Sequence, residues 1–271
     1  MMFDEQVVII GAGPSGLAAA SQLALYGIDA LVLEKNKIGG LLLNAQAVIN
    51  YPGVQAGISG KELIKQFPEP DRISYEEVIN LTSINSGYKV KTVDNVFTTK
   101  AVIVASGTVP KTLEFENFEQ ENIFYSILNL PEITNKSVAV IGGGDVALDY
   151  AMSLTHNSKF SCSEVNVYAR NSFSKCVPHL QKKVENTKAI TLLPYSLPQH
   201  NYKEDIIIVA IGRKPELDFI DDSLLSLPPQ NGSFHLTGDC KNGIYRQTAI
   251  AVGDGVKAAM LLATFLKGNS K

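Results

Sequence analysis

Short runs of apolar, mostly β-branched residues alternate along the chain with stretches in which apolar or small residues recur at helical spacing. Residues 7–10 (VVII) and 138–141 (VAVI) are such runs. Their lack of polar alternation predicts parallel strands that are buried on both faces. Glycines follow each run at once, and the helical pattern then covers residues 17–26 and 146–154. The pattern predicts an α/β fold with parallel sheets.

The chain contains this plan twice, over residues 7–35 and 138–170. Each copy consists of a strand, a glycine turn, a helix and a second strand. The second strand ends next to a charged residue, Glu34 in the first copy and Arg170 in the second. This is the order of a β-α-β nucleotide-binding unit. We therefore expect two Rossmann-like units in one chain.

The glycine turns match the dinucleotide-binding fingerprint. Residues 11–16 have the form G-x-G-x-x-G, and residues 142–147 have the form G-x-G-x-x-A. The first glycine permits a tight turn, the second lets the backbone approach a pyrophosphate, and the third position must be small for close packing. One match is weak evidence, but two in the same context are strong. The predicted contacts are Gly11, Gly13, Pro14, Ser15, Gly16, Gly142, Gly144, Asp145 and Val146.

The two copies favour different nucleotides. Glu34, with Lys35 beside it, lies where a carboxylate accepts hydrogen bonds from ribose hydroxyls, which suits FAD or NAD. The second copy has no acid there. Arg170 and Lys175 would instead neutralise a 2′-phosphate, so NADPH is expected and NADH is the weaker choice. A solvated surface charge is the alternative interpretation of Arg170.

Charge and the N-terminal sequence exclude several classes of protein. The 24 Lys and Arg residues are balanced by 27 Asp and Glu residues, which gives a net charge of -3, so the basic stripe of a nucleic-acid-binding protein is missing. The N-terminus carries acids where a secretory signal is basic. We expect no apolar run of the ~18 residues that a membrane helix needs. A cytoplasmic protein that contacts neither nucleic acid nor membrane is predicted.

Cysteine and histidine spacing predicts no metal site. Cys162, Cys176 and Cys240 are widely spaced and form no C-x-x-C pair, and the four histidines show no paired spacing. Buried or inert thiols are the simplest interpretation of Cys162 and Cys176.

Beyond the glycine turns, the chain resembles the thioredoxin-reductase-like flavoproteins, which bind FAD in the first unit and NADPH in the second. The resemblance covers nearly the whole chain. Residues 38–53 are similar to the family's G-G-Q-L to N-W-P-G segment, with Leu41 in place of the glutamine. Residues 101–110 and 205–215 resemble its A-T-G and A-x-G strands, and residues 236–266 resemble its A-G-D segment with the following R-Q-A-I.

The resemblance implies further cofactor contacts. Asp239 would bind the flavin ribityl chain, and residues 246–248 would lie at a helix N-terminus that faces the flavin pyrimidine ring. A helix N-terminus there stabilises the negative charge of reduced flavin. Cys240 would lie close to the flavin because it follows Asp239. The implied contacts are Gly40, Leu41, Asn50, Ala105, Gly107, Gly238, Asp239, Arg246, Gln247 and Thr248 for FAD, and Gly212 for the nicotinamide nucleotide.

The expected architecture is two Rossmann-like FAD/NAD(P)-binding domains, the second inserted into the first. Residues 1–112 and 232–271 would form the FAD domain, and residues 113–231 the NAD(P)H domain. The second domain is expected to be short, since residues 187–212 leave little room for the sheet insertion that the family carries there. The family commonly forms homodimers.

Thioredoxin reductases carry C-x-x-C about ten residues before the second glycine strand, so that flavin electrons pass to a disulfide. Counting back without gaps places Tyr125 and Leu128 at those positions, and neither can relay electrons by thiol exchange. The resemblance then implies an FAD-dependent NAD(P)H oxidoreductase that passes electrons to a diffusible acceptor, ferredoxin, flavodoxin or quinone. In this it is closer to ferredoxin–NADP reductases of the same scaffold, although those usually carry a C-terminal extension. No catalytic side chain is expected.

Two alternatives stay open. One is a disulfide reductase with a non-standard thiol, for which Cys240 is the candidate. The other is an FAD-binding redox sensor without turnover, which the short second domain suggests.

Overall fold

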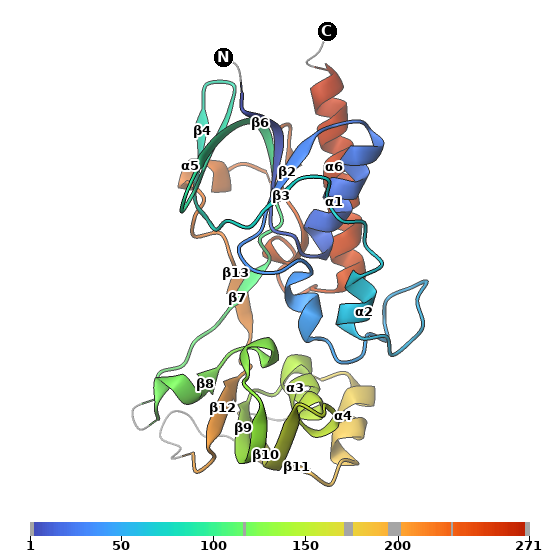
Figure 1. Ribbon diagram of the computed structural model, residues 1–271, viewed down its shortest axis with the longest axis vertical. Coiled ribbons are helices and arrows are strands. Elements are labelled where there is room, and N and C mark those ends of the chain that lie inside the picture. The colour runs from blue at the N-terminus through green and yellow to red at the C-terminus, as the bar shows by residue number, and fades with distance from the viewer. Residues whose placement is uncertain (1–2, 116–117, 171–175, 195–201, 229, 269–271) are drawn as a thin grey trace. The chain divides into compact units, whose positions relative to one another are not determined.

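The computed structural model describes residues 3–115, 118–170, 176–194, 202–228 and 230–268. The chain forms two compact units (Figure 1): residues 1–109 with 215–271, and residues 110–214. The second unit is inserted into the first, as expected. The chain passes between them in strands β7 (Thr108–Pro110) and β13 (Arg213–Pro215), which pair with each other.

One expected boundary was wrong, because residues 215–231 belong to the first unit rather than the second. The Leu81 N–H donates to the Phe219 carbonyl at 2.8 Å, and Leu224 is buried in the same apolar cluster as Leu81. This stretch therefore packs into the core of the first unit, although its sequence carries no nucleotide-binding motif.

The first unit is built on a sheet of order β14-β15-β6-β1-β2-β3, with the β4–β5 hairpin attached to β6. Its central strands are parallel, and Val8 pairs with both Leu31 and Val102. The strands are β1 (Glu5–Ile10), β2 (Ala30–Leu33), β3 (Ile73–Ser74), β4 (Val78–Ile84), β5 (Gly87–Thr92), β6 (Val96–Val104), β14 (Gln230–Asn231) and β15 (Phe234–Leu236). The helices are α1 (Pro14–Leu25), η1 (Gly40–Asn44), α2 (Gly60–Ile64), α5 (Asp222–Leu225), η4 (Gly238–Cys240) and α6 (Thr248–Gly268).

Helices α1 and α6 lie side by side on one face of this sheet (Figure 1). The other face packs against the β4–β5 hairpin and α5. Helix α6 approaches α1 closely because Gly255 lacks a side chain; a Cβ on Gly255 would lie 2.1 Å from the Ser15 carbonyl oxygen. Helix α6 therefore packs directly against the backbone of the first turn of α1.

By length and composition alone, α6 qualifies as a membrane-spanning helix, so the expectation that no such run exists was wrong. The helix passes this test although Asp254 and Lys257 lie in it, because its other residues are mostly apolar or small. Such a helix is weak evidence for a membrane, because core helices pass the same test. One-third of its apolar window is buried, on the face that packs against α1.

The second unit contains a five-stranded parallel sheet of order β11-β10-β9-β12-β8. Its elements are η2 (Gln120–Asn122), β8 (Ile123–Phe124), η3 (Ile127–Asn129), β9 (Ile133–Ile141), α3 (Asp145–His156), β10 (Phe160–Ala169), α4 (Pro178–Glu185), β11 (Ile190–Pro194) and β12 (Ile206–Val209). Helices α3 and α4 cover one face. Aromatic side chains cover the other, and they include Phe115, Phe118, Tyr125 and Tyr202. Within residues 187–212, the range expected to leave little room for the family's sheet insertion, residues 195–201 lie outside the described residues.

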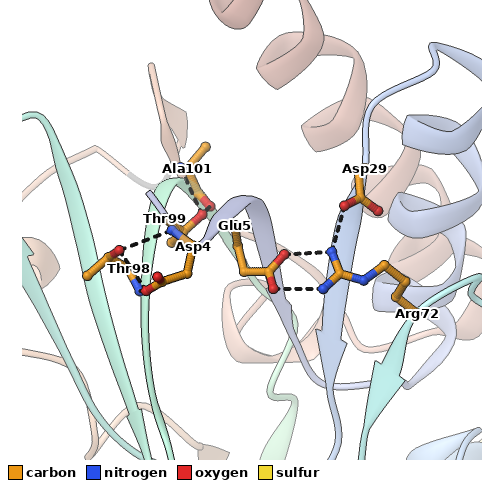
Figure 2. Close-up of polar contacts among 7 residues, drawn as sticks. All are labelled: Asp4, Glu5, Asp29, Arg72, Thr98, Thr99 and Ala101. Carbon is orange, nitrogen blue, oxygen red and sulfur yellow. Dashed lines mark hydrogen bonds and ion pairs between the residues drawn. The ribbon is translucent and has the colours of Figure 1, made fainter. Parts of the chain in front are cut away.

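An ion-pair cluster joins the N-terminal ends of three parallel strands (Figure 2). Arg72, just before β3, donates to both carboxylate oxygens of Glu5 at 2.7 Å and to Asp29 at 2.6 Å. Glu5 is buried, and its bond to the guanidinium is the main reason that the pKa of Arg72 is raised. The cluster lies at the sheet edge opposite to the carboxyl ends of the strands, where nucleotides bind in such sheets.

We expect Arg72→Ala to lower the free energy of unfolding by about 2 kcal/mol, because it leaves the buried Glu5 carboxylate without its bidentate partner. Arg72→Lys keeps the charge but loses the planar fork, so it should lose less. Urea unfolding of the two variants measures the difference. An unchanged urea midpoint in Arg72→Ala would show that water replaces the guanidinium at Glu5 without loss of stability.

His235 is expected to make the free energy of unfolding depend on pH. Its side chain is 1 % exposed, and Nε2 lies 3.0 Å from the Gly232 carbonyl oxygen. Burial holds the pKa of His235 below its usual value. Below about pH 6.5 the unfolded chain binds a proton that the folded chain resists. Stability is therefore expected to fall as pH drops from that value, by at most about 1.4 kcal/mol per pH unit. Urea unfolding between pH 5 and 8 should show a shallower fall in His235→Gln.

Candidate functional site

The first glycine turn is pressed between the ends of β1 and β6. Gly11 has φ +102°, and a Cβ built on it would lie 2.4 Å from the Ala105 carbonyl oxygen. A Cβ on Gly16 would lie 1.9 Å from the Gly11 carbonyl oxygen. Gly11 and Gly16 are thus required by packing, because any side chain at either position meets backbone.

Gly13 is different, since it borders open space. No described atom lies within 4 Å of a Cβ built on it, and its backbone is extended (φ -74°, ψ -179°). It is the N-cap of α1 and has no side chain to occupy the free N–H groups there, and Pro14 begins the helix. An anion fits at this helix N-terminus, so the turn suits a pyrophosphate. Gly40 lies beside Gly13, with its Cβ position 3.4 Å from the Gly13 Cα.

Glu34 follows β2 and is buried. Its Oε2 accepts the Ala12 N–H at 2.7 Å, and its Oε1 accepts the Asn36 N–H at 2.8 Å. A carboxylate has about four acceptor positions, so two are left for ribose hydroxyls, and the side chain also holds the glycine turn in place. Lys35 instead forms an ion pair with Glu216, and its predicted cofactor contact stays a prediction.

The C-terminal part of the chain returns to the first turn of α1. The hydroxyls of Ser15 and Thr237 lie 2.9 Å apart and are buried. Gly238 (φ +70°) packs on Ser15, since its Cβ position is 2.8 Å from the Ser15 Cβ. Asp239 follows in η4 and is half-buried. Thr237 was missed by sequence reasoning; its place directly before Gly-Asp was the available signal.

Two further predicted flavin contacts meet across 197 residues of sequence. The Asn50 amide donates to Gln247 Oε1 at 2.7 Å. Thr248 begins α6, so Arg246 and Gln247 precede a helix N-terminus as expected. Leu41 lies in η1 and is 37 % exposed. All of these residues belong to the first unit.

The second glycine turn repeats the geometry of the first. A Cβ on Gly142 would lie 2.3 Å from the Ala210 carbonyl oxygen, just as a Cβ on Gly11 would lie close to the Ala105 carbonyl oxygen. The Gly142 N–H donates to the Tyr168 carbonyl at 2.8 Å. Gly144 caps α3 and, like Gly13, has no described atom within 4 Å of its Cβ position. The repeat that the sequence predicted is therefore present in three dimensions. The strand ends also correspond, and Gly107 and Gly212 both have positive φ.

The remaining predicted nucleotide contacts of the second unit differ in exposure and in hydrogen bonding. Arg170 is exposed and directly follows β10, and Val146 is 48 % exposed in the first turn of α3. The Asp145 carboxylate accepts the Val177 N–H at 2.7 Å, which links the start of α3 to the residue before α4. Lys175 lies outside the described residues. Their contacts to a nucleotide stay predictions.

The three cysteines are free thiols, and Cys176 and Cys240 are buried. Burial raises the pKa of the Cys162 and Cys176 thiols to about 11. Burial also raises the pKa of Cys240, which is 3 % exposed and donates to the Thr237 carbonyl at 3.1 Å. Thiol exchange requires a thiolate, and these environments oppose it. Across the described residues, no cluster of three or more His, Cys, Asp and Glu side chains is arranged to hold a metal ion.

Comparison with known proteins agrees with this geometry. Residues 5–189 match the pyridine nucleotide-disulphide oxidoreductase family. The chain is 27% identical to a thioredoxin reductase of Borreliella burgdorferi over 98% of its length and 93% of the relative. It is 30% identical to a ferredoxin–NADP reductase of Streptococcus equi over 70% of its length, which is 61% of that protein. The crystal structure of Lactococcus lactis thioredoxin reductase superposes with a TM-score of 0.84 at 25% identity, covering 98% of this chain and 100% of that one.

Two open glycine turns, a buried acid at the ribose position and a family match over residues 5–189 agree. The chain therefore belongs to the pyridine nucleotide-disulphide oxidoreductase family and is an FAD-containing NAD(P)H-dependent oxidoreductase.

Proposed function

We propose that this enzyme oxidises NADPH in preference to NADH and passes the electrons to a small diffusible redox protein, such as a ferredoxin or flavodoxin, without a disulfide of its own. The observation that carries the proposal is the chemistry at the positions where thioredoxin reductases have their cysteines. Tyr125 there is half-buried and donates to the Leu113 carbonyl at 3.4 Å, and Leu128 lies in η3. Neither side chain can exchange with a disulfide.

The three cysteines do not replace the missing pair. Cys240 is the thiol expected nearest to the flavin, and its environment keeps it protonated and covered. Bound FAD supplies a centre that accepts a hydride and releases electrons singly, which a one-electron protein acceptor requires. The chain itself contributes binding and orientation through the α1 turn, Glu34, Asp239 and the start of α6.

The preference for NADPH rests on Arg170. It lies at the end of the second strand of its β-α-β unit, where the adenosine ribose is bound in such units. The acid that binds the ribose hydroxyls in NAD- and FAD-binding units is absent there. A guanidinium there pairs with a 2′-phosphate through charge-assisted hydrogen bonds.

Anaerobic addition of NADPH or NADH, followed by the flavin absorbance near ~450 nm, tests the first half of the proposal. We expect rapid bleaching, faster with NADPH. Turnover with ferredoxin, flavodoxin, a quinone and thioredoxin tests the second half, and Cys240→Ser should leave every rate unchanged. A flavin that stays oxidised would favour a sensor without turnover. Thioredoxin turnover that disappears in Cys240→Ser would establish the disulfide reductase instead.

The enzyme is further proposed to be a cytoplasmic homodimer. Support for a dimer comes from the apolar side chains of α6 that do not pack on α1: Ile250, Met260 and Leu261 are 39 %, 47 % and 41 % exposed. Support for the cytoplasm comes from three free cysteines, which are typical of a reducing compartment. Sedimentation of the wild type and of Leu261→Glu tests the first, and cell fractionation tests the second.

A further inference from the structure

Two buried hydroxyl groups join the start of α1 to the residue that follows β15. Ser15 Oγ and Thr237 Oγ1 lie 2.9 Å apart, and the two residues are 5 % and 0 % exposed. They are separated by 222 positions in the sequence. A buried hydroxyl that loses its partner destabilises a protein. Removal of either group therefore leaves the other without this bond, in a place that water does not reach.

The backbone of both residues is already fixed by other contacts. The Thr237 N–H donates to the Val104 carbonyl at 2.9 Å, and the Thr237 carbonyl accepts the Cys240 thiol at 3.1 Å. On the side of α1, a Cβ on Gly255 would lie 2.1 Å from the Ser15 carbonyl oxygen, so α6 packs on this residue. The hydroxyl bond is therefore a directional link between two pieces of backbone that are each held in place.

This link lies where two predicted FAD contacts come together. Pro14 begins α1 and has no N–H, so Ser15 carries the first backbone donor that the helix offers to a pyrophosphate. Thr237 directly precedes Gly238 and Asp239, and Asp239 is expected to bind the ribityl chain. Gly238 packs on Ser15. Since the pyrophosphate and the ribityl chain are neighbours within FAD, the spacing between α1 and Asp239 has to match the cofactor.

We propose that Ser15 and Thr237 are positioning residues for FAD. Their hydrogen bond holds the turn that carries Asp239 at a fixed distance from the first turn of α1, so that the pyrophosphate and the ribityl chain are bound in one geometry. The hydroxyls act through the backbone that carries them, and such preorganisation lowers the cost of binding. The inference concerns the FAD site alone. It is independent of the nicotinamide nucleotide and of the electron acceptor.

Four variants and one control separate this role from general stability. Ser15→Ala removes one hydroxyl, Thr237→Val removes the other at nearly constant shape, and the double variant removes both. Thr237→Ser keeps the hydroxyl. Tyr88→Phe is the matched control, because the Tyr88 and Ser233 hydroxyls also lie 2.8 Å apart in the same unit. Ser233, however, precedes β15, whereas Thr237 follows it.

The measurement is the rate of FAD release from the diluted holoenzyme, followed by the fluorescence of free flavin. Visible circular dichroism of the bound flavin and thermal unfolding are recorded for each variant. We expect Ser15→Ala and Thr237→Val to release FAD about tenfold faster, as loss of one buried hydrogen bond predicts, and to change the circular dichroism of the flavin. The double variant should release FAD no faster than the single variants, because both residues act through one bond. Thr237→Ser and Tyr88→Phe should keep the wild-type rate and spectrum.

Three results would overturn the proposal. Release at the wild-type rate in both single variants would show that the link does not serve FAD. Losses that add in the double variant would give each side chain a separate role. Faster release in Tyr88→Phe, in step with a lower unfolding temperature, would assign the effect to the stability of the first unit. If Thr237→Val did not fold, Ser15→Ala would carry the same test, since alanine suits a helix.

Discussion

Gly13→Ala is expected to give a folded protein that binds FAD roughly ten to a hundred times more weakly. The backbone at Gly13 is extended and has open space at its Cβ position, so the alanine costs the fold no more than about 1 kcal/mol at a helix N-cap. The new methyl group stands where the pyrophosphate is expected. A charge-assisted hydrogen bond is worth about 1.5–3 kcal/mol, which corresponds to the stated loss of affinity.

Gly16→Ala is the contrasting variant, because its Cβ would lie 1.9 Å from the Gly11 carbonyl oxygen. It should lower the unfolding temperature as well as FAD content, since backbone must move to admit the methyl group, at a cost of about 3 kcal/mol. Gly253→Ala, on an exposed and open part of α6, is the control: it should leave FAD content unchanged and should not lower the unfolding temperature, because alanine favours a helix interior over glycine. FAD content and thermal unfolding of the three variants give the answer. If Gly13→Ala kept full FAD affinity, the pyrophosphate would not lie at this turn.

Gly144→Ala is expected to raise the NADPH concentration for half-maximal flavin reduction by about tenfold or more, with FAD content unchanged. The physical reason is the same, since Gly144 caps α3 and its Cβ position is open, and loss of one phosphate hydrogen bond accounts for the factor. Stopped-flow reduction over a range of NADPH concentrations measures it.

Gly142→Ala supplies the comparison, because a Cβ there would lie 2.3 Å from the Ala210 carbonyl oxygen. It should destabilise the second unit itself. Normal NADPH dependence in Gly144→Ala would place the dinucleotide elsewhere.

The sequence predicted local structure well where one strand and one turn determine it. The glycine turns, the helices after them and the positions of Glu34 and Arg170 at strand ends all follow from patterns that span about 30 residues. Tight turns of this kind tolerate few alternatives, since the glycines at positions 11 and 142 meet backbone atoms of the neighbouring strand.

The sequence was less informative where the structure depends on distant contacts. Residues 215–231 were assigned to the second unit because they carry no motif, and only their packing on Leu81 assigns them to the first. The apolar character of α6 was underestimated, because its small residues, Gly255 and the alanines around it, are explained only by their close packing against α1. Thr237 was overlooked because its role requires Ser15, 222 residues earlier.

The sequence by itself determined that this protein has two nucleotide-binding β-α-β units, and that it lacks the cysteine pair of thioredoxin reductases. Both are properties of residue identity at fixed spacing. Only the tertiary structure decided which glycines border open space, that all three thiols are covered or half-covered, and that Asp145 is hydrogen-bonded to Val177. These depend on atoms that approach across long stretches of chain, which spacing along one strand or helix does not specify.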